Sequence, residues 1–115
     1  MNINKIFNLN NKVIILTGAS GLLGTEYAHG LSQAGANVVL ADLNFEKCKK
    51  LSSNLNKKYC VNSLPIKLDV TKTNSITSMI KQVIKKFSKI DILINNAIFS
   101  EAGHDKMTFE DYDLD

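Results

Sequence analysis

Short, nearly uninterrupted apolar runs alternate along the chain with longer runs in which apolar residues recur every three or four positions. Continuous apolar runs of this length are typical of strands buried on both faces of a sheet, and the longer spacing is typical of amphipathic helices. Strands are therefore predicted over residues 12–18, 36–42, 64–70 and 90–97. Between them, helices are predicted from about Leu22 to Ala34, from about Phe45, and from about Thr71 to Phe87.

The same spacing predicts which side of each helix is buried. In the first helix, the predicted buried stripe is Leu23, Tyr27, Leu31 and Ala34. Gly35 follows as the expected C-terminal stop. In the third helix Thr71 is the expected N-cap. The predicted core stripe of that helix is Ile76, Met79, Ile80, Val83, Ile84 and Phe87.

Strands joined by helical crossovers predict an α/β fold with a parallel sheet and helices on both faces. With the first strand as the switch point, the expected strand order is 3-2-1-4, an incomplete Rossmann-type doubly wound sheet of about four strands. Residues 1–115 form one predicted domain, without repeats or linkers. Residues 98–115 have no sustained period and are predicted as a loop with one helical turn near Thr108.

Composition and charge narrow the possible classes of protein. The 115 residues are 44% hydrophobic and 22% charged, which indicates a globular chain. No apolar run approaches the roughly 18 residues that span a bilayer, and no secretory leader is recognisable, so a cytoplasmic protein without membrane contact is expected. All 14 basic residues are Lys, which argues against nucleic acid as a partner. Cys48 and Cys60 lack metal-ligand or redox spacing, so no metal site is expected.

A glycine-rich turn lies between the first strand and the first helix, in the stretch "LTGASGLLG". Gly18 is suited to turn the chain, Gly21 leaves space for a phosphate, and Gly24 lets the helix approach the sheet. The free N–H groups and the dipole of the helix N-terminus favour a diphosphate there. The turn therefore predicts a dinucleotide site that includes Gly18, Ser20, Gly21, Leu22, Leu23 and Gly24. A tight turn without a ligand is the alternative.

Polar residues follow the other three strands at the same edge of the predicted sheet. Asp42, followed by Leu43, is placed to accept hydrogen bonds from an adenosine ribose and to repel a 2′-phosphate, which favours NAD over NADP. Asp69, followed by Val70, is placed to meet the adenine edge. After the fourth strand come Asn95, Asn96 and Ala97. Structural roles remain open for these residues: helix capping for Asp42, loop capping for Asp69, and sheet support for the asparagines.

Four motifs together give a resemblance to a known family. "TGASGLLG", Asp42, "LDV" and "DILINNA" occur in the order and spacing of the short-chain dehydrogenase/reductase family, over about residues 10–100. The resemblance implies an NAD(P)-dependent oxidoreductase. It also implies that the glycine turn holds the pyrophosphate, the acid after the second strand holds the ribose, and "NNA" steadies the sheet beside the cofactor.

The sequence departs from the compact members of this family at two places. Gly21 comes one position early and Leu22 replaces the expected glycine, as in the extended members that modify sugar nucleotides. Ile98 stands where compact members usually have glycine, so its side chain is expected to crowd the nicotinamide side of the cleft.

The family's catalytic Tyr-x-x-x-Lys is absent from these 115 residues, because no Lys stands four positions after Tyr27, Tyr59 or Tyr112. No catalytic residue is therefore assigned. The expected function is that of the cofactor-binding half of a reductase acting on an alcohol or ketone, with the substrate bound only if the chain is completed. The alternatives are a non-catalytic nucleotide-binding fragment and an extended-type sugar-nucleotide epimerase or dehydratase. The oligomeric state is not predicted.

Overall fold

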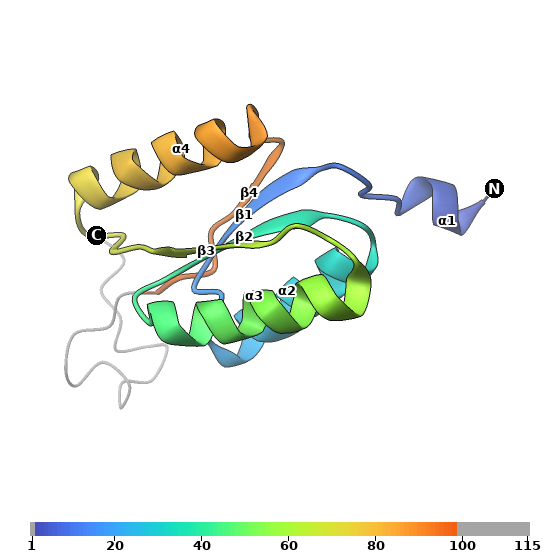
Figure 1. Ribbon diagram of the computed structural model, residues 1–115, viewed down its shortest axis with the longest axis horizontal. Coiled ribbons are helices and arrows are strands. Elements are labelled where there is room, and N and C mark those ends of the chain that lie inside the picture. Colours follow the sequence, from blue (N-terminus) through green and yellow to red (C-terminus); the bar gives the residue numbers. More distant parts are fainter. Residues whose placement is uncertain (1, 99–115) are drawn as a thin grey trace, which may run out of the picture.

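A computed structural model describes residues 2–98 of the chain. Figure 1 shows its elements in chain order: α1 (Ile3–Ile6), β1 (Val13–Thr17), α2 (Leu22–Gln33), β2 (Asn37–Asp42), α3 (Phe45–Tyr59), β3 (Leu64–Lys67), α4 (Thr73–Phe87) and β4 (Ile92–Ile94). The short helix α1 was not predicted, since four residues are too few to show a period. The turn expected near Thr108 lies outside the described residues.

The four strands form one parallel sheet in the order β3-β2-β1-β4, which confirms the predicted topology. Two strands are shorter than predicted. The strand expected over 64–70 ends at Lys67, because the N–H of Asp69 donates to Ser75 Oγ instead of continuing the ladder. The strand expected over 90–97 ends at Ile94, because the N–H of Asn96 donates to the Thr17 hydroxyl. Both changes place polar loop residues at the carboxyl edge of the sheet.

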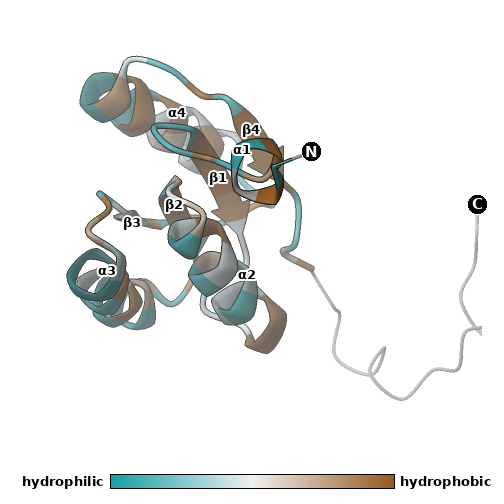
Figure 2. Ribbon diagram, turned by 90° about the vertical axis from the view of Figure 1, so that its right-hand side faces the viewer, coloured by the Kyte–Doolittle hydropathy of each residue, from teal (hydrophilic) through white to brown (hydrophobic). Residues whose placement is uncertain are grey.

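Alternate residues of the central strands face two separate cores. Ile14 and Leu16 of β1 pack with Val38 and Leu40 of β2 against α2 and α3. On the other face, Val13 and Ile15 join Val39, Ala41 and Ile66, and α4 covers them with Met79 and Val83. Figure 2 shows these hydrophobic strands between the helices of the two faces. The sheet is therefore sandwiched, as the continuous apolar runs predicted.

The predicted buried stripe of the first helix was half wrong: Leu31 packs against the core and Ala34 is half-buried, but Leu23 and Tyr27 are exposed. The buried residues of α2 are Gly24, Ala28 and Ser32, whereas Leu23 is 59% exposed and Tyr27 is 43% exposed. Small residues face the sheet because α2 packs closely against it, and a stripe of large side chains would hold the helix away. Gly35 does end the helix as expected, with a φ of +101°.

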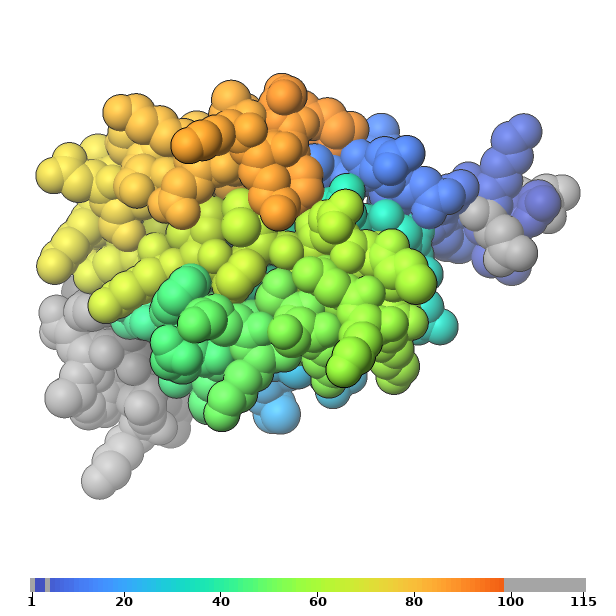
Figure 3. Space-filling view, viewed as in Figure 1, coloured from blue at the N-terminus to red at the C-terminus, as the bar shows by residue number. Residues whose placement is uncertain are grey.

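The predicted core stripe of α4 was only half right. Met79 and Val83 are buried, but Ile76, Ile80 and Ile84 are 36–44% exposed. Among the described residues α4 is the one helix on its face of the sheet, so nothing covers its second apolar side (Figure 3). No helix within residues 2–98 is both long and apolar enough to cross a membrane.

The two cysteines are free thiols in contrasting surroundings. Cys48 is buried in the core beneath α3, while Cys60 is exposed just after the same helix. Burial raises the pKa of the Cys48 thiol to about 12, and the negative charge of Asp42 acts in the same direction. Cys48 therefore stays protonated and shielded, and unreactive, over the physiological range.

We expect one thiol to react in the folded protein. A maleimide or disulfide reagent near pH 8 should label Cys60 quickly and Cys48 only after denaturation, because Cys48 is buried and protonated. Counting labels by mass spectrometry checks this, with Cys60→Ser as the control that removes the fast label. Equal labelling rates of the two thiols in the folded state would contradict the packing of α3.

Candidate functional site

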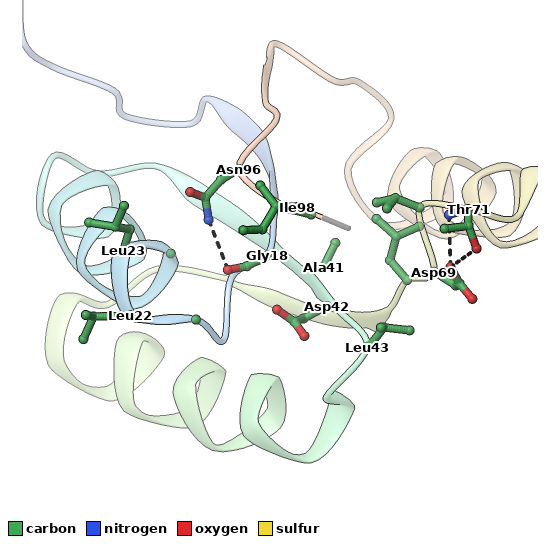
Figure 4. A pocket seen from close by; sticks show the side chains of 15 residues that line it. Gly18, Leu22, Leu23, Ala41, Asp42, Leu43, Asp69, Thr71, Asn96 and Ile98 are labelled. Carbon is green, nitrogen blue, oxygen red and sulfur yellow. Dashed lines mark hydrogen bonds between the residues drawn. The ribbon is translucent and has the colours of Figure 1, made fainter. Parts of the chain in front are cut away.

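A cavity of about 410 Å³ opens at the carboxyl edge of the sheet (Figure 4). The ends of all four strands and the start of α2 contribute to its lining. All of the predicted site residues line it except Ser20 and Asn95. The lining also includes Ile98, which was expected at the cleft, and three residues that were not predicted there: Ala41, Leu68 and Thr71.

Two glycines of the turn are required by close packing. Gly18 has a φ of +68°, and a Cβ on it would lie 2.9 Å from the Ala97 Cα. A Cβ on Gly24 would overlap the carbonyl oxygen of Gly18 and lie 2.9 Å from the Ala19 Cα. Gly18 and Gly24 thus allow the end of β1, the start of α2 and the segment after β4 to meet.

Gly21 is different, because the fold leaves room for a side chain there. Its φ is −73°, and a Cβ would make only an ordinary contact, at 3.4 Å, with the Gly18 oxygen. The residue is exposed and lines the cavity. Packing among residues 2–98 therefore does not explain this glycine, whereas a ligand that approaches the backbone closely would.

The first turn of α2 offers free hydrogen-bond donors beside Gly21. The N-cap Gly21 has no side chain to cap the helix, and the first intrahelical bond runs from Thr25 N to Gly21 O. Within residues 2–98, the N–H groups of Leu22, Leu23 and Gly24 have no acceptor. Together with the positive end of the helix dipole, three free N–H groups on a cavity could hold an anion of diphosphate size.

Asp42 joins the glycine turn to the end of β2. Its Oδ2 accepts from Ser20 N at 3.1 Å, and its Oδ1 accepts from Asn44 N at 3.0 Å. A carboxylate has about four lone-pair positions, so each oxygen can accept one bond more. Ser20 thus serves the site through its backbone although it does not line the cavity. The cap of α3 is Asn44, which accepts from Lys47 N, so Asp42 is not the helix cap.

Asp69 belongs to a tight turn after β3. Its Oδ1 accepts from the Thr71 N–H at 3.0 Å and from the Thr71 hydroxyl at 2.6 Å. These bonds lower the pKa of Asp69, the hydroxyl bond most strongly, and the charges of Lys72 and Lys67 add to them. The predicted capping role of Thr71 was wrong, because Lys72 is the N-cap of α4 and Thr71 closes the Asp69 turn instead.

Thr17, which was not predicted as a site residue, organises the segment after β4. Its hydroxyl accepts from the N–H groups of Asn96 and Ala97, both at 3.0 Å, and donates to Ile94 O at 3.4 Å. The side chain of Asn96 donates to Gly18 O at 3.2 Å. Asn96 therefore supports the sheet and lines the cavity at once, while Asn95 is exposed outside it. The sequence feature that could have identified Thr17 as a site residue was its place directly before the glycine turn.

Along the rim, the groups follow the strand order of the sheet. Asp69 after β3 is followed by Asp42 after β2, the glycine turn after β1, and Ile98 after β4. Exposed apolar side chains stand among them, including Leu43 at 62% and Val70 at 40% exposed. The arrangement suits an elongated ligand with a central anion, a polar group over β2 and flat apolar groups toward the ends.

The chain is similar in sequence to known dehydrogenases. Residues 12–114 match the family model described as short chain dehydrogenase. The NADP-dependent 3-hydroxy acid dehydrogenase of Schizosaccharomyces pombe is 39% identical over 90 residues, which is 77% of this chain and 35% of that protein. The first curated relatives are matched over 35–40% of their own length.

Solved structures share the fold as well. L-Sorbose reductase from Gluconobacter frateurii, complexed with NADPH and L-sorbose, superposes with a TM-score of 0.78 at 27% identity, over 90% of this chain and 40% of that one. NAD⁺-bound xylitol dehydrogenase gives a TM-score of 0.74 at 32% identity, over 79% of this chain and 35% of that one.

Replacing Gly21, Gly24 and Gly30 by alanine should change the free energy of unfolding by different amounts. Gly21 is the N-cap of α2, and Gly24 and Gly30 lie within the helix. Gly24→Ala should lower the free energy of unfolding by about 3 kcal/mol or more, because its Cβ overlaps backbone. Gly21→Ala should cost about 1 kcal/mol or less, since only the cap preference changes. Gly30 has nothing within 4 Å and serves as control, so Gly30→Ala should stabilise slightly. Urea denaturation checks the order, and a Gly21→Ala cost equal to that of Gly24→Ala would contradict it.

Proposed function

Because the chain belongs to the short chain dehydrogenase family, we propose that it binds NAD in preference to NADP. We also propose that it forms the cofactor-binding part of an oxidoreductase that moves hydride between nicotinamide and an alcohol or ketone. The proposal rests on one observation above all. Three donors without an acceptor among the described residues, on Leu22, Leu23 and Gly24, lie on a cavity beside a glycine that packing does not require.

The pyrophosphate would be held by this uncapped turn of α2. Its oxygens can accept from the three N–H groups while Gly21 leaves the approach open. The positive end of the helix dipole adds roughly half an elementary charge in its favour. When bound, the nicotinamide supplies the hydride chemistry, and the residues of this chain bind and orient the cofactor.

Preference for NAD would come from Asp42. Each of its oxygens has one bond to backbone and a lone pair to spare, so the carboxylate can accept from the ribose hydroxyls. A 2′-phosphate at the same place would face the charge of Asp42, with the Asp69 carboxylate on the same rim. Relatives named for NADP and neighbours named for NAD⁺ both occur, so this local charge, rather than family membership, carries the preference.

The adenine would lie beyond the ribose, between β2 and β3. Leu43 and Val70 line this part of the cavity and are exposed enough to gain by covering a flat ring. The ionised Asp69 stands beside them. Its Oδ1 accepts from Thr71, and its Oδ2, which lies 4.0 Å from Lys72 Nζ, can also accept from the adenine edge.

Acid–base catalysis would need residues beyond those described. Tyr27 and Tyr59 do not line the cavity, and Tyr59 instead contacts His29, with 3.1 Å between its hydroxyl and Nδ1. Within the described residues, one apolar side of α4 is uncovered, and β4 pairs only with β1. Further polypeptide could cover this face. We propose that such polypeptide supplies the catalytic groups; a purely nucleotide-binding role is the alternative.

Binding of NAD to the chain tests the proposal directly. Calorimetric titration of the wild-type chain should give a measurable Kd for NAD, and Gly21→Ala should weaken it by about tenfold or more, because a methyl group occupies phosphate space. Gly30→Ala, on the exposed side of the same helix, should leave the Kd unchanged. Absence of NAD binding by a folded wild-type chain would refute the proposal.

The NAD preference is tested by the ratio of two affinities. Wild type should bind NAD more tightly than NADP, and Asp42→Ala should bring the two Kd values at least about tenfold closer, because the repulsive charge is gone. Val70→Ala, at the adenine end, is the control that should weaken both cofactors alike. An unchanged ratio in Asp42→Ala would remove Asp42 from the ribose site, whatever the absolute affinities.

A further inference from the structure

Ile98 is the most exposed large apolar side chain in the part of the chain that the structure describes. It is 90% exposed, belongs to neither core, and lines the cavity. An aliphatic side chain in this state gains free energy when another apolar surface covers it. Compact members of the family usually have glycine at this position, so the side chain is a departure from their pattern.

The backbone that presents Ile98 is held firmly beside the glycine turn. Thr17 accepts from the two preceding N–H groups, those of Asn96 and Ala97, and Asn96 in turn donates to Gly18 O. A Cβ on Gly18 would come within 2.9 Å of the Ala97 Cα, which shows how closely the two segments approach. Figure 4 shows Ile98 beside Gly18, so the side chain borders the place where the central anion would sit.

The strand order fixes which half of the ligand Ile98 can meet. The proposed adenosine groups lie after β3 and β2, and the diphosphate site lies after β1. A dinucleotide that follows this rim must place its second nucleoside after β4, where Ile98 stands. An adenosine diphosphate without that nucleoside would end at the glycine turn.

We propose that Ile98 is a specificity-determining residue that packs its aliphatic side chain against the nicotinamide nucleoside of the cofactor. This inference rests on the proposed function, since it requires the diphosphate at the start of α2. In this arrangement Ile98 adds affinity to the second nucleoside and none to the adenosine half. If the same side chain instead crowded the cofactor, it would weaken NAD binding. The NAD affinity of Ile98→Ala distinguishes the two cases.

A series of three ligands tests the inference on the full 115-residue chain. ADP, ADP-ribose and NAD should each be titrated into wild type, Ile98→Ala and Val70→Ala, with the thermal unfolding of each variant recorded beside it. Ile98→Ala should weaken NAD by about three- to tenfold and ADP by less than about twofold, because NAD reaches beyond the turn and ADP does not. ADP-ribose, which carries the second ribose without nicotinamide, should fall between them. Val70→Ala, the matched control at the opposite end, should weaken all three ligands by a similar factor.

Each remaining outcome has a defined meaning. Equal weakening of ADP and NAD by Ile98→Ala, or no change in either, would overturn the inference. Tighter NAD binding by Ile98→Ala would overturn it in favour of crowding. In both cases the proposed function stands, because wild type still binds the dinucleotide. A folded wild-type chain that binds none of the three ligands would overturn the proposed function and this inference together.

Discussion

The close approach of α2 to the end of β1 is the constraint on which the rest of the site depends. Gly24 lies so near the Gly18 carbonyl that no side chain fits between them. This contact directs the first turn of α2 to the carboxyl edge of the sheet, where its N–H groups have no acceptor among the described residues. A helix held one side chain farther away would direct those donors elsewhere, and the cavity would lose its central anion site.

Hydrogen bonds from side chains then fix the neighbouring loops to that turn. Asp42 accepts from Ser20 N, and Asn96 donates to Gly18 O, so the ends of β2 and β4 are both tied to the glycine segment. Thr17 completes this set by accepting two N–H groups from the segment after β4. The polar groups of the cavity therefore hold one another in place before any ligand arrives, which lowers the ordering cost of binding.

Helices cover the two faces of the sheet to different extents. Helices α2 and α3 cover one face, whereas α4 covers the other alone within the described residues. Leu93 pairs with Ile15 and so points to the α4 face, yet it is 55% exposed. Ile80 and Ile84 of α4 are also exposed, at 43% and 44%, and β4 is an edge strand among the described residues. Exposed surface of this kind usually marks a site of further association.

The sequence by itself determined the element order, the parallel sheet and the family, because strand and helix periods and the turn chemistry of Gly18–Gly24 are local properties. It also placed Asp42, Asp69 and Asn96 at one edge, since parallel strands end together. Only the tertiary structure decided that Gly24, Ala28 and Ser32, rather than the larger apolar residues, face the sheet. It likewise decided that Thr17 and Ser20 serve the site through hydrogen bonds rather than by lining it. Which helix side is buried, and which donor meets which acceptor, depends on the distance between packed elements, and no local pattern encodes that distance.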